Sequence, residues 1–321
     1  VGNAAPLPPN VMLVASYSVS SDLSHSQSPK AASAREAIYS CRLEPQVLAW
    51  ESRLQKLRRQ LLYYGSDIVC LQALQSIGFT ERCSEEDTQW FSFEDEPSAN
   101  HLVHVYRELS KANYGVVFAP TMKLPGSAAI CFGNAVFWKR SRWRLERHFK
   151  LCDSAVCVHL TSRNGGLPVL ACSTKTAASY ALEWGDQPTE EELLHPLRAV
   201  AEGLARAAAD HSARVLWCGD FGCGPKALRA GLPQLGPPEG ADGHSLAWES
   251  AYAALGEEPW TSASPFSSGL AADHVLAAGL GRLLAVLGGW PGPPDAVELL
   301  QCGYPSDHLL LLAAYADEPG G

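Results

Sequence analysis

Three short apolar runs, each meeting acidic or histidine side chains at one end, most strongly constrain how this chain folds. They span residues 214–220, 271–276 and 304–312. Apolar runs of this length beside turn residues are typical of buried strands. Taken alone, the run at residues 304–312 is better explained by a capped core strand with a half-buried histidine. Together they predict converging strand ends, where carboxylates and an imidazole can hold a divalent metal and a phosphate: Asp220, Asp273, Asp307 and His308.

The size and composition of the chain fit one intracellular domain. Its 321 residues, 46% of them apolar, suffice for a large core. No apolar run approaches the ~20 residues that span a bilayer, so we expect no membrane association. The ten cysteines lack a Cys-x-x-Cys motif and lie mostly inside apolar runs, which is typical of reduced intracellular thiols. The chain begins with valine, which is compatible with a removed targeting segment, so we expect either the cytoplasm or the mitochondrion.

The charge of the chain argues against general affinity for nucleic acid. A net charge of -9 and a pI near 5.6 oppose binding that depends on neutralising phosphates, and we expect no DNA partner. An acidic run from residue 81 to 96 is typical of a solvated insertion. Two local clusters are nevertheless basic: Lys139, Arg140, Arg142, Arg144 and Arg147, and Arg53, Lys56, Arg58 and Arg59.

Hydrophobic periodicity predicts strands that alternate with two long helices. Apolar residues recur at helical spacing over residues 47–64, and Thr189 with Glu192 forms a capping box that opens a helix ending near Asp210. Shorter helices are predicted at 101–109 and 244–255. Predicted strands cover residues 11–19, 67–72, 114–118, 128–132, 135–138, 155–160, 167–173 and 214–220, and the runs at Val275 and Leu309.

This pattern predicts an α/β fold with four layers, an αββα sandwich in which two packed mixed β-sheets are flanked by helices. The expected organisation is an arm, a single domain with an acidic insertion, and a tail. The corresponding residues are 1–10, 11–316 with the insertion near 80–100, and 317–321.

The order of several motifs resembles a known superfamily. The matching stretches are Trp50-Glu51-x-Arg53, residues 66–72, residues 114–120, residues 133–139, Cys218-Gly219-Asp220, Ser250-Ala251-Tyr252 and Pro305-Ser306-Asp307-His308. In this order they resemble the exonuclease–endonuclease–phosphatase superfamily, and within it the deadenylase branch that contains nocturnin, the Angel proteins and the catalytic nuclease of the main cytoplasmic deadenylase complex. The resemblance runs from residue 11 to 315 and implies a DNase I-like fold.

The resemblance also implies roles for the four strand-end residues. Asp220 matches the acid that activates or orients the attacking water. Asp273 would hold His308 through the second ring nitrogen, which fixes the tautomer and the charge. Asp307 would contribute to the metal region, and His308 would face the scissile phosphate. The alternative is a polar cluster that has only a structural role.

The chain departs from the family pattern at five positions. Ser18 stands where the first strand of the family ends in asparagine, and Ala73 stands where the principal magnesium-binding glutamate is found. Lys175 matches a histidine, Gly222 the asparagine of the Asp-x-Asn pair, and Phe132 an aspartate. Magnesium usually depends on one or two carboxylates, and losing one transition-state stabiliser costs about 10²–10³ in rate. We therefore expect vestigial chemistry, with no metal site and no cofactor.

The resulting hypothesis is a catalytically inactive, deadenylase-like domain. It would act as a binding or scaffolding subunit with protein partners in an RNA-associated complex, and RNA is a further candidate partner. The alternative is an active Mg-dependent 3′-5′ exoribonuclease, poly(A) deadenylase or related phosphodiesterase that uses Asp22, Glu81 or Glu183 as substitute ligands. A nucleotide or lipid-headgroup phosphatase is a third reading.

Lys175 carries a separate hypothesis. Its ammonium could replace part of the metal charge by pairing with Asp220, or it could bind a phosphate. An ordinary solvated lysine is the alternative.

Overall fold

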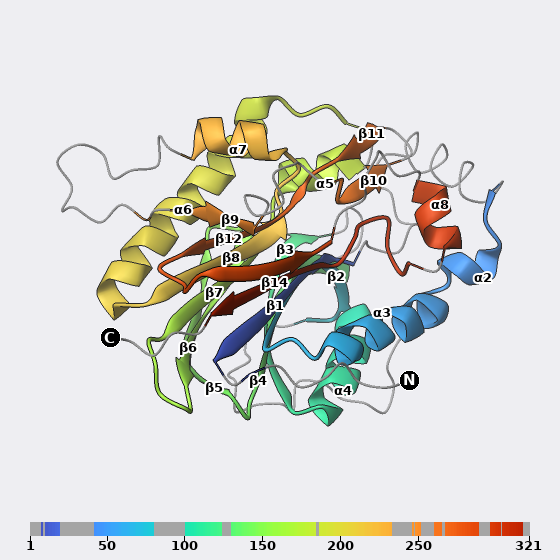
Figure 1. The fold of residues 1–321 in the computed structure, drawn as a ribbon. Coiled ribbons are helices and arrows are strands. Elements are labelled where there is room, and N and C mark those ends of the chain that lie inside the picture. Colours follow the sequence, from blue (N-terminus) through green and yellow to red (C-terminus); the bar gives the residue numbers. More distant parts are fainter. Residues whose placement is uncertain are drawn as a thin grey trace.

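The computed structural model of the chain describes residues 8, 10–19, 42–79, 100–123, 130–183, 186–232, 246, 248–251, 260–264, 267–288, 296–302 and 304–316. Within them, two six-stranded mixed sheets pack face to face and helices cover the outer faces (Figure 1). The predicted four-layer αββα sandwich is confirmed.

The first sheet joins the two ends of the chain. Its order is β13-β14-β1-β2-β4-β3, with β1 parallel to β2 and antiparallel to β14. The blue β1 and the red β14 lie side by side in Figure 1, although they come from opposite ends of the sequence. Its strands are β1 (Val11–Ser18), β2 (Ile68–Ile77), β3 (Tyr114–Lys123), β4 (Ile130–Lys139), β13 (Leu283–Leu287) and β14 (Leu311–Ala316).

The second sheet has the order β5-β6-β7-β8-β12-β9, with β7 parallel to β8. A separate two-stranded ribbon joins β10 (Ser262–Ser264) to β11 (Ser267–Leu270). The strands of the second sheet are β5 (Trp143–Leu151), β6 (Ala155–Ser162), β7 (Val169–Lys175), β8 (Arg214–Asp220), β9 (Glu249–Ser250) and β12 (Asp273–Ala278).

Helices lie on the outside of both sheets. The helices α3 (Trp50–Tyr64) and α4 (His101–Lys111) cover the first sheet, and α6 (Glu190–His211) covers the second. The predicted capping box of α6 is present, with Thr189 and Glu192 each satisfying a backbone N–H of the other. The shorter helices are α2 (Pro45–Leu48), α5 (Ala177–Glu183), α7 (Pro225–Gly231) and α8 (Ala296–Gln301).

Apolar side chains from both sheets fill the space between them. They alternate along each strand with side chains that face the helices, so the central strands are buried on both faces. Examples from the inner layer are Val14 and Ile68 of the first sheet and Val156 and Leu216 of the second. This packing leaves the strand ends, rather than the sheet faces, as the place for polar chemistry.

Several local expectations were wrong. The strands predicted at 128–132 and 135–138 are one strand, β4, as far as they lie in the described residues 130–139, and residues 248–251 contain the short strand β9 instead of a helix. The strand β5 was not predicted, and its first half overlaps the segment interpreted only as a basic cluster. It was missed because it is an edge strand whose polar side chains hide the alternation of a buried strand. Neither α5 nor β13 was predicted.

Most of the predicted N-terminal arm, nearly all of the acidic insertion near 80–100, and the C-terminal tail lie outside the described residues. Among the helices that the structure describes, none is long and apolar enough to cross a membrane.

Candidate functional site

The candidate site lies where strands of both sheets end. Because β7 and β8 are parallel, Lys175 and Asp220 are register partners at their carboxyl ends, and Asp273 at the start of β12 is the partner of Asp220. Ser18 ends β1 in the facing sheet. His308 lies just before β14 and forms a bridge with the ribbon strand β10. The topology thus brings five sequence-predicted residues to one edge of the sandwich.

Lys175 occupies the centre of this edge. Its side chain is fully buried. Nζ donates to Asp220 Oδ2 at 2.6 Å, to Ser18 Oγ at 3.1 Å and to Glu183 Oε1. The ammonium also lies 4.8 Å from the ring centroid of Tyr180, within range of a cation–π interaction. The hypothesis that the ammonium pairs with Asp220 therefore fits the geometry, whereas a solvated lysine does not.

Both oxygens of Asp220 accept hydrogen bonds from the protein. Oδ1 accepts from Ser179 Oγ at 2.7 Å and from the backbone N–H of Gly222 at 3.2 Å. Oδ2 accepts from Lys175 and, more weakly, from Ser18 Oγ at 3.4 Å. A carboxylate engaged on both oxygens has little remaining capacity to orient a water molecule or to bind a metal ion.

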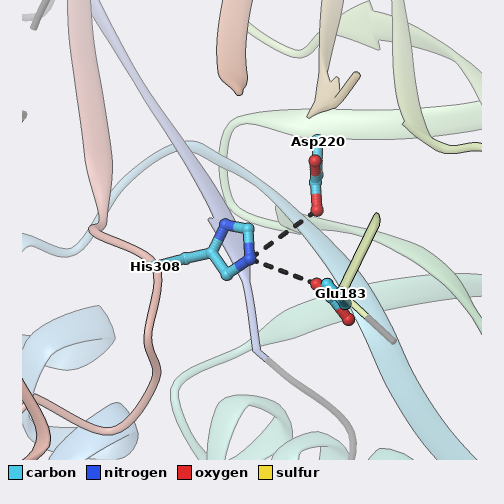
Figure 2. A group of neighbouring side chains, drawn as sticks. All are labelled: Glu183, Asp220 and His308. Atoms are coloured by element: carbon cyan, nitrogen blue, oxygen red, sulfur yellow. Dashed lines mark hydrogen bonds and ion pairs between the residues drawn. The ribbon is translucent and has the colours of Figure 1, made fainter. Parts of the chain in front are cut away.

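His308 lies between carboxylates on both sides of its ring. Nδ1 is 2.8 Å from Asp273 Oδ2, and Nε2 is 3.2 Å from Glu183 Oε1 and 3.8 Å from Asp220 Oδ2. Figure 2 shows the ring pointing at Glu183 and Asp220, which come from α5 and β8. An imidazole facing carboxylates through both nitrogens is stabilised in its protonated form, in which neither nitrogen keeps a lone pair for a metal.

The pKa values follow from burial and these pairings. Burial lowers the pKa of Lys175, but the attraction of Asp220 and Glu183 outweighs it and the pKa is raised. Burial raises the pKa of Asp220, and the opposing attraction of Lys175 and His308 brings it down to about 2. Burial lowers the pKa of His308, but the attraction of Asp273 and Asp220 raises it well above its ordinary value. Burial raises the pKa of Asp273 to about 6. The cluster is therefore ionic and internally compensated.

The short helix α5 closes the site from outside. It contributes three buried side chains, those of Ser179, Tyr180 and Glu183. Tyr180 packs beside Phe132, with ring centroids 6.3 Å apart, in an apolar group that also contains Ala73. Ala73 sits in a bulge of β2 at a φ of 59°, so the position that matches the family glutamate faces an apolar contact.

Two more predicted positions add no side-chain ligand atom to the central group. Gly222 has a φ of 67°, and a Cβ there would lie 3.0 Å from side-chain atoms of Leu182 and Leu193, so an asparagine would be strained and would require these leucines to shift. Asp307 is buried and accepts from Ser306 Oγ at 3.3 Å. It is not among the described residues whose ligand atoms cluster around His308.

Arg53 fixes the loop that carries His308. Its buried guanidinium donates from Nε to the carbonyl of Pro305 at 2.7 Å and from Nη2 to the carbonyl of Val19 at 2.6 Å. The predicted helix-opening motif therefore connects the end of β1 to the loop before β14. This contact positions His308 without touching it.

The residues present do not fit a divalent metal in this arrangement. Glu183, Asp220 and His308 offer ligand atoms within 4.8 Å of one another. However, Lys175 Nζ is bonded to two of the three, and an ammonium so close to carboxylate oxygens repels a second cation. The site already contains its positive charge.

Sequence reasoning missed most of α5. Ser179 and Tyr180 were not predicted, and Glu183 was considered only as a substitute metal ligand. The other two substitutes, Asp22 and Glu81, lie outside the described residues. A local signal was available, because the hydroxyl of Thr176 accepts from the N–H of Ser179, as a helix-capping residue does.

Comparisons with known proteins agree with this architecture. The family model of the Endonuclease/Exonuclease/phosphatase family matches residues 38–308. No curated protein sequence matches. Among solved structures, the chain resembles ANGEL2, described as a 2′,3′-cyclic phosphatase, with a TM-score of 0.64 at 16% identity, covering 95% of this chain and 94% of that one.

Two further structures share the fold. The catalytic domain of human nocturnin with bound sulfate gives a TM-score of 0.58 at 17% identity, covering 97% of this chain and 94% of that one. D. rerio TDP2 with a single-strand DNA product gives 0.52 at 15% identity, covering 95% and 98%. At these identities the likeness concerns the fold.

Proposed function

Because this chain belongs to the Endonuclease/Exonuclease/phosphatase family, we propose that it is a catalytically silent member serving as a binding or scaffolding subunit of an RNA-associated assembly. One observation carries this proposal. The ammonium of Lys175, fully buried, is bonded to Asp220 and Glu183 at the strand ends where the family resemblance puts catalysis.

The arrangement opposes phosphoester hydrolysis in three ways. A base must have a free lone pair, and both oxygens of Asp220 accept from protein donors. A Lewis acid must approach the carboxylates, and Lys175 neutralises them first. A substrate must reach the site, yet Asp220, His308 and Lys175 are each at most 3% exposed. The effects of losing several catalytic residues are not additive. Hydrolysis is still not restored here, because each of these three obstacles acts before the chemical step.

The proposed RNA association starts from the ligands of the structural neighbours. These neighbours are a 2′,3′-cyclic phosphatase, a nocturnin domain with bound sulfate and a TDP2 complex with a single-strand DNA product, so phosphate or phosphate-like groups recur among them. If the chain acts through a binding surface rather than through its strand-end site, we expect the fold to be retained even though Lys175 fills that site. The partners would then be proteins of an RNA-containing complex, with RNA contacted directly or through them.

A second candidate is an active Mg-dependent exoribonuclease or related phosphodiesterase. The cluster of Glu183, Asp220 and His308 favours it, because Glu183 lies where a substitute carboxylate is needed. For this function Lys175 must leave both carboxylates and α5 must move away from the strand ends. Each movement breaks buried ionic hydrogen bonds, so we rank this function below the first.

Hydrolysis assays distinguish the two functions. The purified chain is incubated with Mg²⁺ or Mn²⁺ and either an oligo(A) RNA or an RNA that ends in a 2′,3′-cyclic phosphate. The matched control is the double variant Asp220→Ala, His308→Ala, which removes both polar centres of the site.

We expect identical product levels for the parent and the double variant with either substrate. A metal-dependent product that EDTA abolishes, and that the double variant lacks, refutes the silent-domain proposal and establishes the enzyme.

A further inference from the structure

Basic residues are unevenly distributed along this acidic chain. Residues 139–163 contain seven lysines and arginines and two acidic residues, whereas the chain as a whole carries a net charge of -9. Lys139 and Arg142 are partly used internally, because Asp67 pairs with both at 3.5 and 2.8 Å. The cations that remain exposed lie mainly on β5, the edge strand of the second sheet (Figure 1).

A bulge in β5 places the two arginines of this strand on one face. Arg144 is the partner of Thr161 and Arg147 the partner of His159, with the register shift between Leu145 and Arg147. Thr161 and His159 are two residues apart on β6, so their side chains share a face. Arg144 and Arg147 are three apart and would point to opposite faces in a regular strand. The bulge therefore aligns two guanidinium groups that regular pleating would separate.

Ring side chains lie beside Arg147 on the same face. The guanidinium of Arg147 lies 5.5 Å from the ring centroid of Phe149. The rings of His159 and His211 stack with centroids 4.8 Å apart, next to Arg147 in the strand register. The buried Nε2 atoms of both histidines have no hydrogen-bond partner within the described part of the chain. Arginines beside rings are the groups with which proteins hold phosphates and stack bases of single strands.

Glu146, the bulged residue, limits the charge of this face. Its Oε1 accepts from Thr161 Oγ1 at 2.6 Å and pairs with Arg144 Nη2 at 2.6 Å. The side chain of Arg144 still has 63% of its surface exposed. The glutamate thus orients Arg144 while leaving it available to a ligand.

Protection of a sheet edge does not by itself explain this pattern. Charged side chains, lysines in particular, keep edge strands from pairing with other sheets. That purpose requires neither a bulge that gathers two arginines on one face nor rings beside them, so this arrangement needs another cause. Charge complementarity to a polyanion supplies it.

We propose that the Arg144/Arg147 face of β5 binds the phosphate backbone of single-stranded RNA. This inference rests on the proposed role as an RNA-associated subunit and names the surface that performs it. Two guanidinium groups on one face of an extended strand fit successive phosphates, and the adjacent rings offer surfaces for a base.

Fluorescence anisotropy with a labelled oligo(A) RNA tests the surface, with the full chain in EDTA so that hydrolysis plays no part. The test variant is Arg144→Glu, Arg147→Glu. The matched control is Arg59→Glu, Lys226→Glu, which changes the net charge equally at exposed positions on α3 and α7. A third variant, Glu146→Gln, removes the carboxylate that pairs with Arg144. Thermal unfolding shows whether each variant folds.

We expect the test variant to weaken binding about tenfold or more and to reduce the slope of log K against log salt by about 1.4, from two contacts at about 0.7 each. The control should change affinity by less than about twofold, and Glu146→Gln should tighten binding about twofold. Equal weakening by test and control variants overturns the proposal. So does a parent chain that binds poly-glutamate but not RNA, since the partner would then be an acidic protein segment. Neither result bears on whether the Lys175 site is silent.

Discussion

Replacing Lys175 with methionine should destabilise the fold more than any surface change. At 2.6 Å and an effective dielectric constant of about 20, the attraction between the ammonium and Asp220 is about 6 kcal/mol before desolvation is counted. Leaving a buried charge without its partner typically costs about 3–5 kcal/mol. The methionine fills a similar volume, so the loss is electrostatic. We expect the free energy of unfolding to fall by about 3–5 kcal/mol.

Urea unfolding of four proteins isolates the pair: the parent, Lys175→Met, Asp220→Asn, and the double variant. Because the double variant carries a neutral amide in place of the Asp220 carboxylate, no unpaired charge is left at that position. The double variant should therefore recover about 2–3 kcal/mol relative to the sum of the single variants. A loss below about 1 kcal/mol for Lys175→Met, or additive single effects, would refute the claim that this ammonium stabilises the cluster.

Three smaller predictions concern the surroundings of Asp220. Ser179→Ala removes a hydrogen bond to a charged group and should cost about 1.5–3 kcal/mol in urea unfolding, with a value near zero contradicting its role. Gly222→Ala should cost about 1–2 kcal/mol, because its φ of 67° is unfavourable for a Cβ, and an unchanged midpoint would contradict the strain. The pKa of Asp220 is about 2, below its unfolded value, so its contribution of about 2 kcal/mol is present above about pH 4 and lost as pH falls towards 2. Unfolding at pH 5 and pH 3 should show about half of this loss in the parent and less of it in Asp220→Asn; an equal loss in both would contradict the assignment to Asp220.

Much of the fold could be predicted because local patterns and packing agree. The run that ends at Asp220 is a buried strand, and the capping box at Thr189 begins the helix that covers it. The edge strand β5 could not be found from alternation, because only one of its residues, Trp143, is fully buried. This strand forms because it pairs with β6, and the hydrophobic periodicity of its own sequence does not indicate that pairing.

The residues at the strand ends could be predicted, but their relationships could not. Lys175 could be matched to a family histidine. Whether its ammonium faces solvent or carboxylates, however, depends on Glu183, which lies on α5. A short alanine-rich helix has a weak hydrophobic pattern, so the closure of the site depends on tertiary packing such as that of Tyr180 against Phe132. The residue pattern could therefore raise the hypothesis that Lys175 pairs with Asp220, whereas its second carboxylate partner, Glu183, required the structure.

Calorimetric titration of Mn²⁺ into the parent and into Lys175→Ala tests whether the ammonium takes the place of a divalent metal. If it does, the parent should show no binding at the site. Removing the ammonium should allow Glu183 and Asp220 to bind one Mn²⁺ ion, which His308 can join only by giving up its Nε2 proton. Stoichiometric Mn²⁺ binding by the parent that Asp220→Asn abolishes would contradict this reading of the site.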